Sequence, residues 1–452
     1  MSAVVSRLLD EATRTDFLPS ALLVSFAVKR LPDALAVWAN GCYEDGGAVA
    51  TGVPGIVENT FAVSVAGDDS LSEPRSPDDG IIAYADRYGG YGVGCHGGSG
   101  RCGFVGSVQV KGIGRTPLVG RGGDQAHSHG FMTLEEAIRE AVFSRFFKII
   151  LPHGIVETLG VIDTGDCMPW GERKGLLLRP AFFRASALVR APFFNPAAEM
   201  KDPHIVDVAR VTAALKILDE PAESRARYGF RIGSLKAFLV RACEQLAACH
   251  FHQAYPGPFS TSNLTINGAL LDFGSARIVP GFRRYVSVGG GTAFGVEDVA
   301  LLALCLQDIR WHVRTYGPES QFDDCPSDLR TYVFSTYAKT IINLFKMREA
   351  LPELENFLSE QLRPRVLLDI EFTRRPPLDD VEADVVEVIS TVRDLLRDNG
   401  GALQSPVRLV PSLVGPDRAG LQSAIYAVTE SQPAGRLSQR SLRDLSKLID
   451  GC

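Results

Sequence analysis

The fold prediction depends on residues 86–111, which read DRYGGYGVGCHGGSGRCGFVGSVQVK. This stretch contains a dense glycine cluster followed directly by the pattern of a short strand. Glycine lets backbone amides approach an anion closely, so such a cluster can hold phosphate, although glycine clusters more often form plain turns. From Ser107 to Lys111 apolar and polar residues alternate, which predicts a strand. An ammonium group at the end of that strand can act as a point charge on phosphate oxygens. The nucleotide-binding candidates in this stretch are Gly90, Gly94, Gly98, Gly100, Arg101 and Lys111.

A predicted helix follows and supplies a partner for the lysine. Thr133 and Glu136 have the spacing of a capping box, and apolar residues recur after them at helical spacing. Glu140 lies on this helix, 140 − 111 = 29 residues after Lys111, and the glycine-rich loop 112–130 accounts for the long separation. A strand-borne lysine paired with a helix-borne glutamate is the ion pair that fixes the phosphate-binding lysine of kinases. Lys111 and Glu140 are therefore catalytic candidates.

A second group of polar residues lies in the other half of the chain. A loop ends at Asn263, and a hairpin is expected around Asn267-Gly268, a dipeptide typical of a type I′ turn. Asp272-Phe273-Gly274 follows directly. A carboxylate and an amide oxygen can share a hard cation such as Mg²⁺, which neutralises triphosphate charge. Asn263 and Asp272 are the candidate metal ligands.

The organisation of the chain predicts an α+β protein with a protein-kinase-like, two-lobed fold. Short apolar runs separated by Gly and Pro predict strands up to residue 190, including one at Ser186–Arg190. Helical periodicity dominates later, at Val206–Leu218, Leu235–Cys249, Val296–Val313, Asp328–Phe345, Leu354–Leu362, Val381–Leu396 and Ser441–Ile449. The expected segments are an N-terminal extension (1–84), a β-rich N-lobe (85–198), a helical C-lobe (199–400) and a C-terminal tail (401–452).

Composition narrows the functional class. The 452 residues carry 47 basic and 53 acidic side chains, a formal charge of −6, so a general nucleic-acid binder is not expected. No apolar run is long enough to predict a membrane span. Nine cysteines are scattered without a CxxC pair, which is typical of a reducing compartment, and we expect a cytoplasmic protein.

Several motifs resemble those of the selenoprotein O family of protein adenylyltransferases, over roughly residues 85–300. The family's LKGAGRTP resembles the sequence VKGIGRTP at Val110–Pro117. Its IRE helix motif matches Ile138–Glu140, and its asparagine and DYG, at close spacing, match Asn263 and Asp272–Gly274. Its glycine-loop and LxRVAP motifs resemble Tyr88–Gly94 with Gly98–Cys102, and Leu188–Pro192, respectively.

The resemblance implies a kinase-like fold that binds ATP in an inverted pose and transfers AMP to a hydroxyl of a protein or peptide acceptor. It implies that Lys111, Glu140 and Arg190 grip the phosphates. It also implies that Asn263 and Asp272 hold Mg²⁺, or Mn²⁺ in its place.

The chain also departs from the family pattern. Ser262 stands where the family has the loop aspartate, and it completes the set of catalytic candidates. Tyr91-Gly92 replaces a His-Gln pair, and Ser99 replaces the aspartate of the glycine loop. Because positioning and charge neutralisation supply most of the catalysis of phosphoryl-group transfer, a missing base need not abolish it. Two alternatives therefore stay open: a kinase-type phosphotransferase, and a catalytically inactive nucleotide-binding pseudokinase.

Overall fold

The computed structural model describes most of the chain up to residue 344 and one later helix. The described residues are 10–14, 16–40, 53–65, 81–123, 128–196, 202–219, 235–252, 254–278, 285–287, 290–292, 296–317, 326–344 and 437–450. The helices predicted at Leu354–Leu362 and Val381–Leu396 lie outside these residues.

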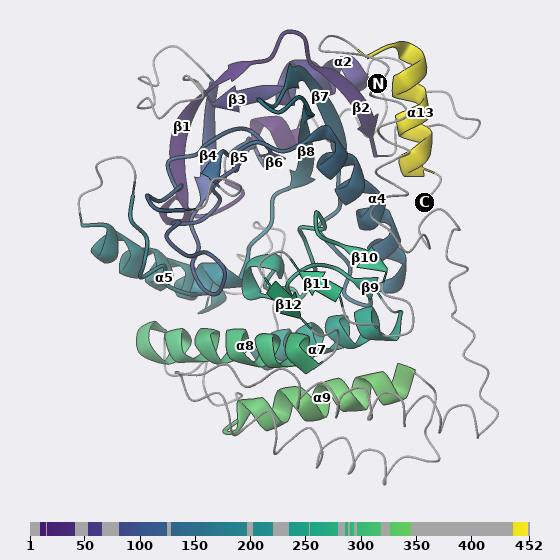
Figure 1. The fold of residues 1–452 in the computed structure, drawn as a ribbon. Helices are drawn as coiled ribbons and strands as arrows, with labels where there is room; N and C mark the ends of the chain where they lie inside the picture. Colours follow the sequence, from purple (N-terminus) through teal and green to yellow (C-terminus); the bar gives the residue numbers. More distant parts are fainter. Residues whose placement is uncertain are drawn as a thin grey trace, which may run out of the picture.

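An eight-stranded antiparallel sheet forms one end of the molecule (Figure 1). Its strands follow one another in the order β2-β7-β8-β6-β5-β4-β1-β3. Their bounds are β1 Leu23–Arg30, β2 Leu35–Ala39, β3 Val63–Val65, β4 Ile81–Asp86, β5 Cys102–Val105, β6 Val108–Lys111, β7 Gly160–Cys167 and β8 Arg173–Pro180. The predicted segment boundary at residues 84 and 85 falls within β4, and the sheet takes strands from both sides of it.

The centre of the sheet explains why residues 102–111 form strands. All four residues of β5 and all four of β6 are buried. β6 pairs with β5 on one side and with β8 on the other, so its last residue, Lys111, lies opposite Cys102 and Leu177. The predicted strand ending at Lys111 is confirmed, and its neighbours place the lysine inside the molecule.

Helix α4 (Leu134–Ile150) packs against β7 and β8. Thr133 caps its N-terminus, since its side chain accepts a hydrogen bond from the backbone amide of Glu136. The short helix α2 (Val53–Phe61) packs against β2, and the C-terminal helix α13 (Gln439–Asp450) packs against both β2 and α4.

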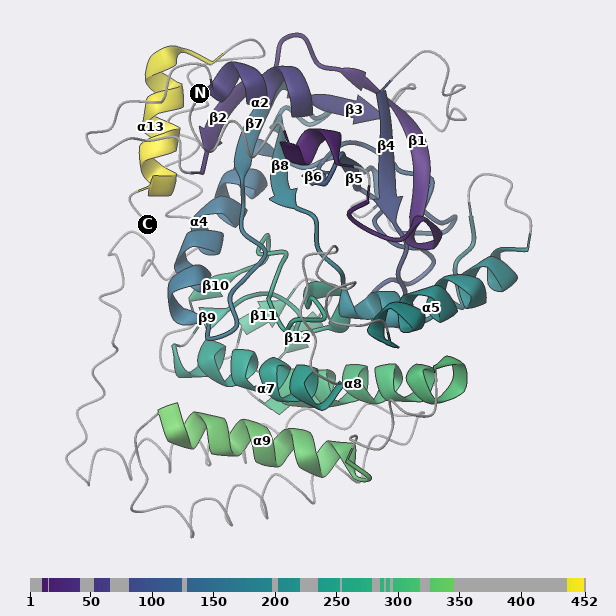
Figure 2. The same ribbon diagram turned by 180° about the vertical axis from the view of Figure 1, so that it is seen from behind.

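The remaining long helices lie at the opposite end from the sheet, as Figures 1 and 2 show from two sides. They are α5 Pro203–Asp219, α7 Leu235–Phe251, α8 Val296–Tyr316 and α9 Leu329–Leu344. A polar network ties three of them together, because the buried His250 of α7 bonds Tyr337 of α9 at 2.6 Å and lies 3.2 Å from Asp298 of α8.

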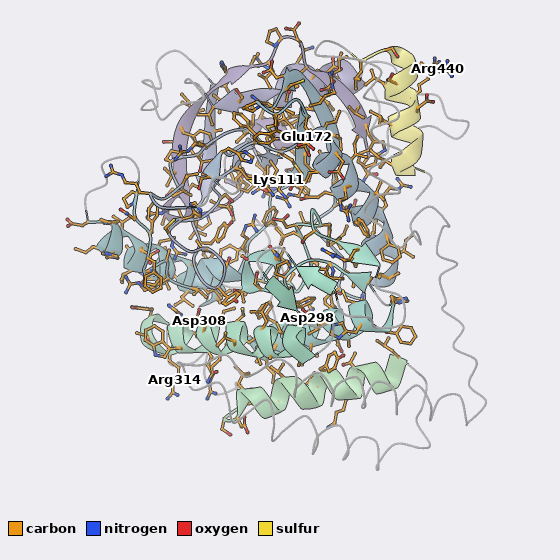
Figure 3. All side chains as sticks on the ribbon, viewed as in Figure 1. Lys111, Glu172, Asp298, Asp308, Arg314 and Arg440 are labelled. Atoms are coloured by element: carbon orange, nitrogen blue, oxygen red, sulfur yellow. The ribbon has the colours of Figure 1, made fainter. Side chains whose placement is uncertain are left out.

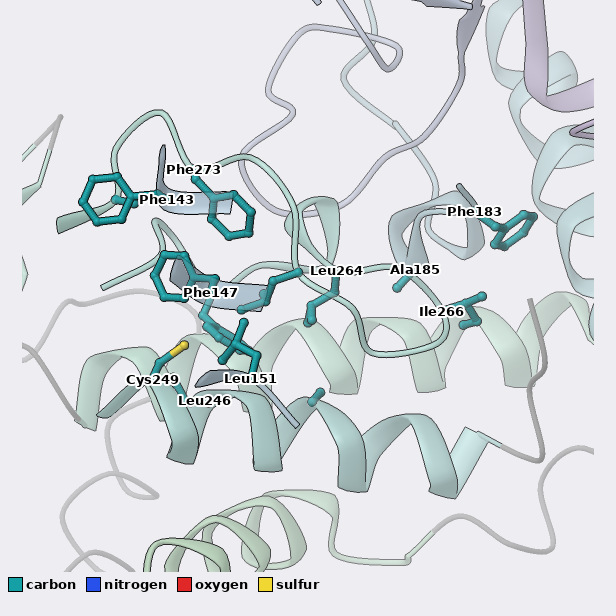
Figure 4. Close-up of a cluster of buried hydrophobic side chains, with 14 of the residues drawn as sticks. Phe143, Phe147, Leu151, Phe183, Ala185, Leu246, Cys249, Leu264, Ile266 and Phe273 are labelled. Carbon is teal, nitrogen blue, oxygen red and sulfur yellow. The ribbon is translucent and has the colours of Figure 1, made fainter. Parts of the chain in front are cut away.

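Short elements connect the two ends. Among the described residues they include the 3₁₀ helices η1 Ser20–Leu22, η3 Ala185–Leu188 and η4 Thr261–Asn263. They also include the strand pairs β9 Ala254–Tyr255 with β10 Arg277–Ile278 and β11 Tyr285–Ser287 with β12 Gly290–Thr292. In Figure 4 the aromatic rings of Phe143 and Phe147, from α4, lie beside Phe273 and above Leu246 and Cys249 of α7. The stacked Phe147 and Phe273 rings, 4.9 Å apart, fix the chain just after Asp272.

The prediction of an α+β protein is confirmed at the level of a mixed fold with a large antiparallel sheet and several helices. The strand predicted at Ser186–Arg190 is wrong, because η3 occupies its first three residues and the backbone amides of Ala187 and Val189 form local bonds, to Arg184 C=O and Ser186 C=O. The type I′ turn is also wrong. Asn267 has no positive φ; instead Gly268 N–H bonds Thr265 C=O and Gly268 alone has a positive φ, of 86°. This is the geometry of a type I turn followed by a left-handed glycine.

No helix in the described part of the chain is both long and apolar enough to cross a membrane.

Candidate functional site

Lys111 lies at the side of the sheet that faces the helices (Figure 3). Its ammonium group forms a buried ion pair with Glu140 Oε1 of α4. It also donates a hydrogen bond to Asp272 Oδ1 at 2.6 Å. The structure therefore brings the strand-borne lysine, the helix-borne glutamate and the aspartate of Asp-Phe-Gly into direct contact, although 161 residues separate Lys111 from Asp272.

Asp272 has an unusual backbone conformation. Its φ is 70°, in the left-handed region, which only one other described non-glycine residue, Asp202, also enters. Asp tolerates this region better than most residues, and such conformations cluster at functional sites. The residues on either side hold Asp272 in place, since Leu271 N–H bonds Asn263 C=O at 3.1 Å and Phe273 is buried against Phe147.

A second acidic residue of α4 joins the site one turn before Glu140. The Glu136 carboxylate accepts two hydrogen bonds from Arg101, at 2.8 and 3.2 Å, and lies 3.8 Å from Lys111 Nζ. The spacing of Thr133 and Glu136 predicts that Glu136 is half of a capping box. The structure confirms the Thr133 half and directs the Glu136 carboxylate into the site.

The electrostatics differ between the three carboxylates. Burial raises the pKa of Glu140 to about 7, with Asp272 adding to the effect and Lys111 opposing it. Burial also favours the protonated form of Asp272. The positive charges of Lys111, Arg101 and Arg179 outweigh this effect, so the pKa of Asp272 is held well below its usual range. Burial also opposes ionisation of Glu136, and Arg101 and Lys111 together lower its pKa. Asp272 and Glu136 are therefore carboxylates at neutral pH, whereas Glu140 is poised to take up a proton.

The loop that precedes Asp272 is closely bonded. Ser260 and Ser262 share a hydrogen bond between their hydroxyls at 2.7 Å, and the Asn263 side-chain amide donates to Pro258 C=O at 2.9 Å. Because the nitrogen of that amide is engaged, its oxygen is the atom that Asn263 offers to a cation. Ser262 therefore lies directly before a candidate metal ligand, and its hydroxyl is bonded within the loop.

Most of the glycines predicted to bind nucleotide, in residues 90–100, lie against neighbouring parts of the chain. Gly90 N–H bonds Arg190 C=O at 3.2 Å. Gly98 has a φ of 146°, and a Cβ there would lie 2.2 Å from Asp86 C=O, so only glycine fits. A Cβ at Gly100 would lie 3.1 Å from Val119, and Gly94, with a φ of 58°, has nothing within 4 Å.

The side chain of Arg190 points to other partners. It contacts Asp207 of α5 at 3.3 Å and Tyr316 of α8 at 3.4 Å. It therefore lies with the helices rather than in the network around Lys111.

Two buried arginines that were not predicted from the sequence border the site. Arg179 of β8 is 2% exposed, lies 4.0 Å from Glu140 and donates to Gln109 at 2.8 Å. Arg184 bonds Asp86 at 3.0 Å and also donates to Ser262 C=O, so it ties the end of β4 to the loop before Asp272. Arginine is seldom buried without a charged partner, but a single sequence does not show which arginines are buried.

Asp272 and Asn263 remain the two candidate metal ligands. In the described ranges, no group of three or more His, Cys, Asp or Glu side chains is arranged to hold a metal ion. Asp272 and Asn263 nevertheless supply one ionised carboxylate and one amide oxygen, which is the protein contribution that Mg²⁺ takes when substrate phosphates complete its shell.

No protein-family model matches the sequence, and no curated protein matches it significantly.

Proposed function

We propose that this protein is a Mg·ATP-dependent nucleotidyltransferase with a protein-kinase-like, two-lobed fold, which transfers AMP to a hydroxyl of a protein or peptide acceptor. The observation that carries the proposal is the contact of the buried Lys111 with both Glu140 and Asp272. A strand lysine, a helix glutamate and the aspartate of Asp-Phe-Gly are the parts that a kinase-like fold uses on nucleotide phosphates.

In the proposed reaction the residues have separate roles. Lys111 and Arg101 neutralise phosphate oxygens, and the flanking Arg179 adds positive charge. Glu140 keeps Lys111 in place. Asp272 and the Asn263 amide would hold Mg²⁺, whose charge offsets that of the triphosphate.

The bond changes define the reaction class. The acceptor oxygen forms a bond to the α-phosphorus, the bond from that phosphorus to the bridging oxygen breaks, and pyrophosphate leaves as the hydroxyl proton passes to solvent. Ser262 supplies no carboxylate to take that proton. Rate enhancement would come from orientation and charge neutralisation, which can account for most catalysis of this class.

A cytoplasmic location belongs to the same proposal. The six cysteines within the described residues are all free thiols, which suits a reducing compartment.

The test is intact-mass analysis of the protein, with and without a mixed peptide acceptor, after incubation with Mg²⁺ and ATP labelled at either the α- or the γ-phosphate. Transfer of the α-label, with pyrophosphate released, supports the proposal. Transfer of the γ-label alone would replace it with a kinase-type phosphotransferase, and ATP binding without transfer would indicate a nucleotide-binding pseudokinase.

A further inference from the structure

Glu136 stands out because its carboxylate touches two of the candidate phosphate-binding cations. It accepts a two-pronged hydrogen bond from Arg101 and lies 3.8 Å from Lys111 Nζ. The side chain is 24% exposed, whereas Lys111 and Glu140 are almost fully buried. Glu136 therefore lies at the more open side of the ion network.

The network around Lys111 is balanced in charge. Contacts of 4.0 Å or less connect three cations, Arg101, Lys111 and Arg179, with three carboxylates, Glu136, Glu140 and Asp272. With all six ionised the network has no net charge, and with Glu140 protonated it has a single positive charge. It therefore offers little net attraction to an anion that arrives without its own cations.

Phosphate binding would disturb this balance. Phosphate oxygens that take Lys111 and Arg101 as partners leave Asp272 and Glu136 without their counter-ions. Carboxylates that lose their counter-ions inside a protein are costly unless another cation replaces them. A divalent cation that arrives with the phosphates supplies that replacement.

We propose that Glu136 makes phosphate binding dependent on a divalent cation, by lowering the net positive charge of the ligand-free network and competing with phosphate for Arg101 and Lys111. This inference rests on the proposed function, whose nucleotide site it deepens. It makes Glu136 a residue that sets specificity for the metal-complexed nucleotide over the free one.

A purely structural role predicts the opposite sign. Arg101 precedes β5 and Glu136 lies on α4, so the pair also joins the glycine-rich segment to the helix. If Glu136 only positioned Arg101, loss of its charge would weaken phosphate binding, as loss of Arg101 would.

The experiment measures the dissociation constants of ATP and of inorganic tripolyphosphate by calorimetry, in excess Mg²⁺ and in chelator without metal. The proteins are the full chain, Glu136→Gln, Glu136→Asp and Arg101→Gln. Glu157→Gln is the matched surface control, since Glu157 pairs with Lys148 at 2.6 Å and both are exposed. Thermal unfolding of each variant checks that the fold is retained.

Glu136→Gln is expected to lower the dissociation constants measured without metal about tenfold, and to change those measured in excess Mg²⁺ about twofold or less. The ratio of the metal-free constant to the Mg²⁺ constant therefore becomes smaller. Glu136→Asp, which keeps the charge, and Glu157→Gln should retain the wild-type ratio. Arg101→Gln should weaken binding in both conditions.

An unchanged ratio in Glu136→Gln, or weakening in both conditions as in Arg101→Gln, would overturn the inference. If the wild-type protein bound neither probe in either condition, the inference and the proposed function would fail together. Binding that follows the expected pattern without transfer of a label would contradict the proposed reaction alone.

Discussion

At the scale of single residues, the site depends on the lack of a side chain at Gly274. A Cβ at this position would lie 2.9 Å from Glu136 Oε1 and 3.1 Å from Glu140 Oε1. Glu136 is partly exposed and can move aside, whereas Glu140 is buried and paired with Lys111, so the added methyl would disturb the ion network. The glycine of Asp-Phe-Gly is thus explained here by its closeness to α4.

Gly274→Ala is therefore expected to weaken Mg·ATP binding about tenfold while changing the free energy of unfolding by about 1 kcal/mol or less. Gly55→Ala is the matched control, because a Cβ at Gly55 meets nothing within 4 Å. Calorimetric titration and urea unfolding of both variants test this. Equal affinities in the two variants would contradict it.

The raised pKa of Glu140 predicts a specific pH dependence of stability. Because burial raises the pKa in the fold to about 7, above the usual value of 4.5, the protonated form is favoured by folding. The stability that Glu140 contributes to the fold in its protonated form is fully present below pH 4.5 and is lost as the pH rises through about 7. Asp272 acts in the other direction, because its lowered pKa gives stability that is lost only when the solution becomes strongly acidic.

Urea unfolding at pH 5 and pH 8 measures this contribution when wild type is compared with Glu140→Gln. The wild-type protein should lose more stability between the two pH values than the variant, which has no proton to release at this position. Other titrating groups are shared and cancel in the comparison. Parallel changes in the two proteins would show that Glu140 does not titrate in this range.

At the scale of elements, α4 is the part that connects the site to the rest of the sheet end. Its buried face packs on β7 and β8, it carries both glutamates, and α13 packs against it from the C-terminal end of the chain. Leu445 and Ile449 of α13 are fully buried there. The C-terminal helix is thus part of the support for α4.

Leu445→Ala should lower the free energy of unfolding by about 2–5 kcal/mol, because it leaves a cavity between α13, β2 and α4. Arg440→Ala is the control on the same helix; its side chain is 88% exposed, and a change within about 0.5 kcal/mol is expected. Chemical denaturation measures both. A loss below about 0.5 kcal/mol in Leu445→Ala would mean that α13 adds little to the stability of the fold.

The elements were predictable where local pattern decides them. The strand ending at Lys111 and the helix capped by Thr133 follow from alternation and capping. The strand predicted at Ser186–Arg190 failed because η3 forms there, directly after Arg184 and Ala185 pair with the hairpin residues Thr265 and Leu264, a contact between distant segments. Such long-range pairing overrides local strand propensity and cannot be seen in a short window.

At the scale of the whole molecule, Lys111 comes from the sheet and Asp272 from the chain between the helices. Their contact was the central expectation of the sequence analysis, and the 2.6 Å hydrogen bond places them together. The roles of Arg179, Arg184 and Glu136 were not predictable, because they depend on which charged side chains are buried side by side. Arg190, expected among the phosphate ligands, lies with Asp207 and Tyr316.

The most direct test of the account is calorimetric titration of Mg·ATP into the wild-type protein and into Asp272→Asn. Asparagine also tolerates the positive φ of Asp272, so the substitution removes the charge and spares the backbone. We predict measurable Mg²⁺-dependent binding to wild type and its loss in the variant. Equal Mg·ATP affinity in the two proteins, or no binding to wild type, would contradict the claim that Lys111 and Asp272 form one nucleotide site.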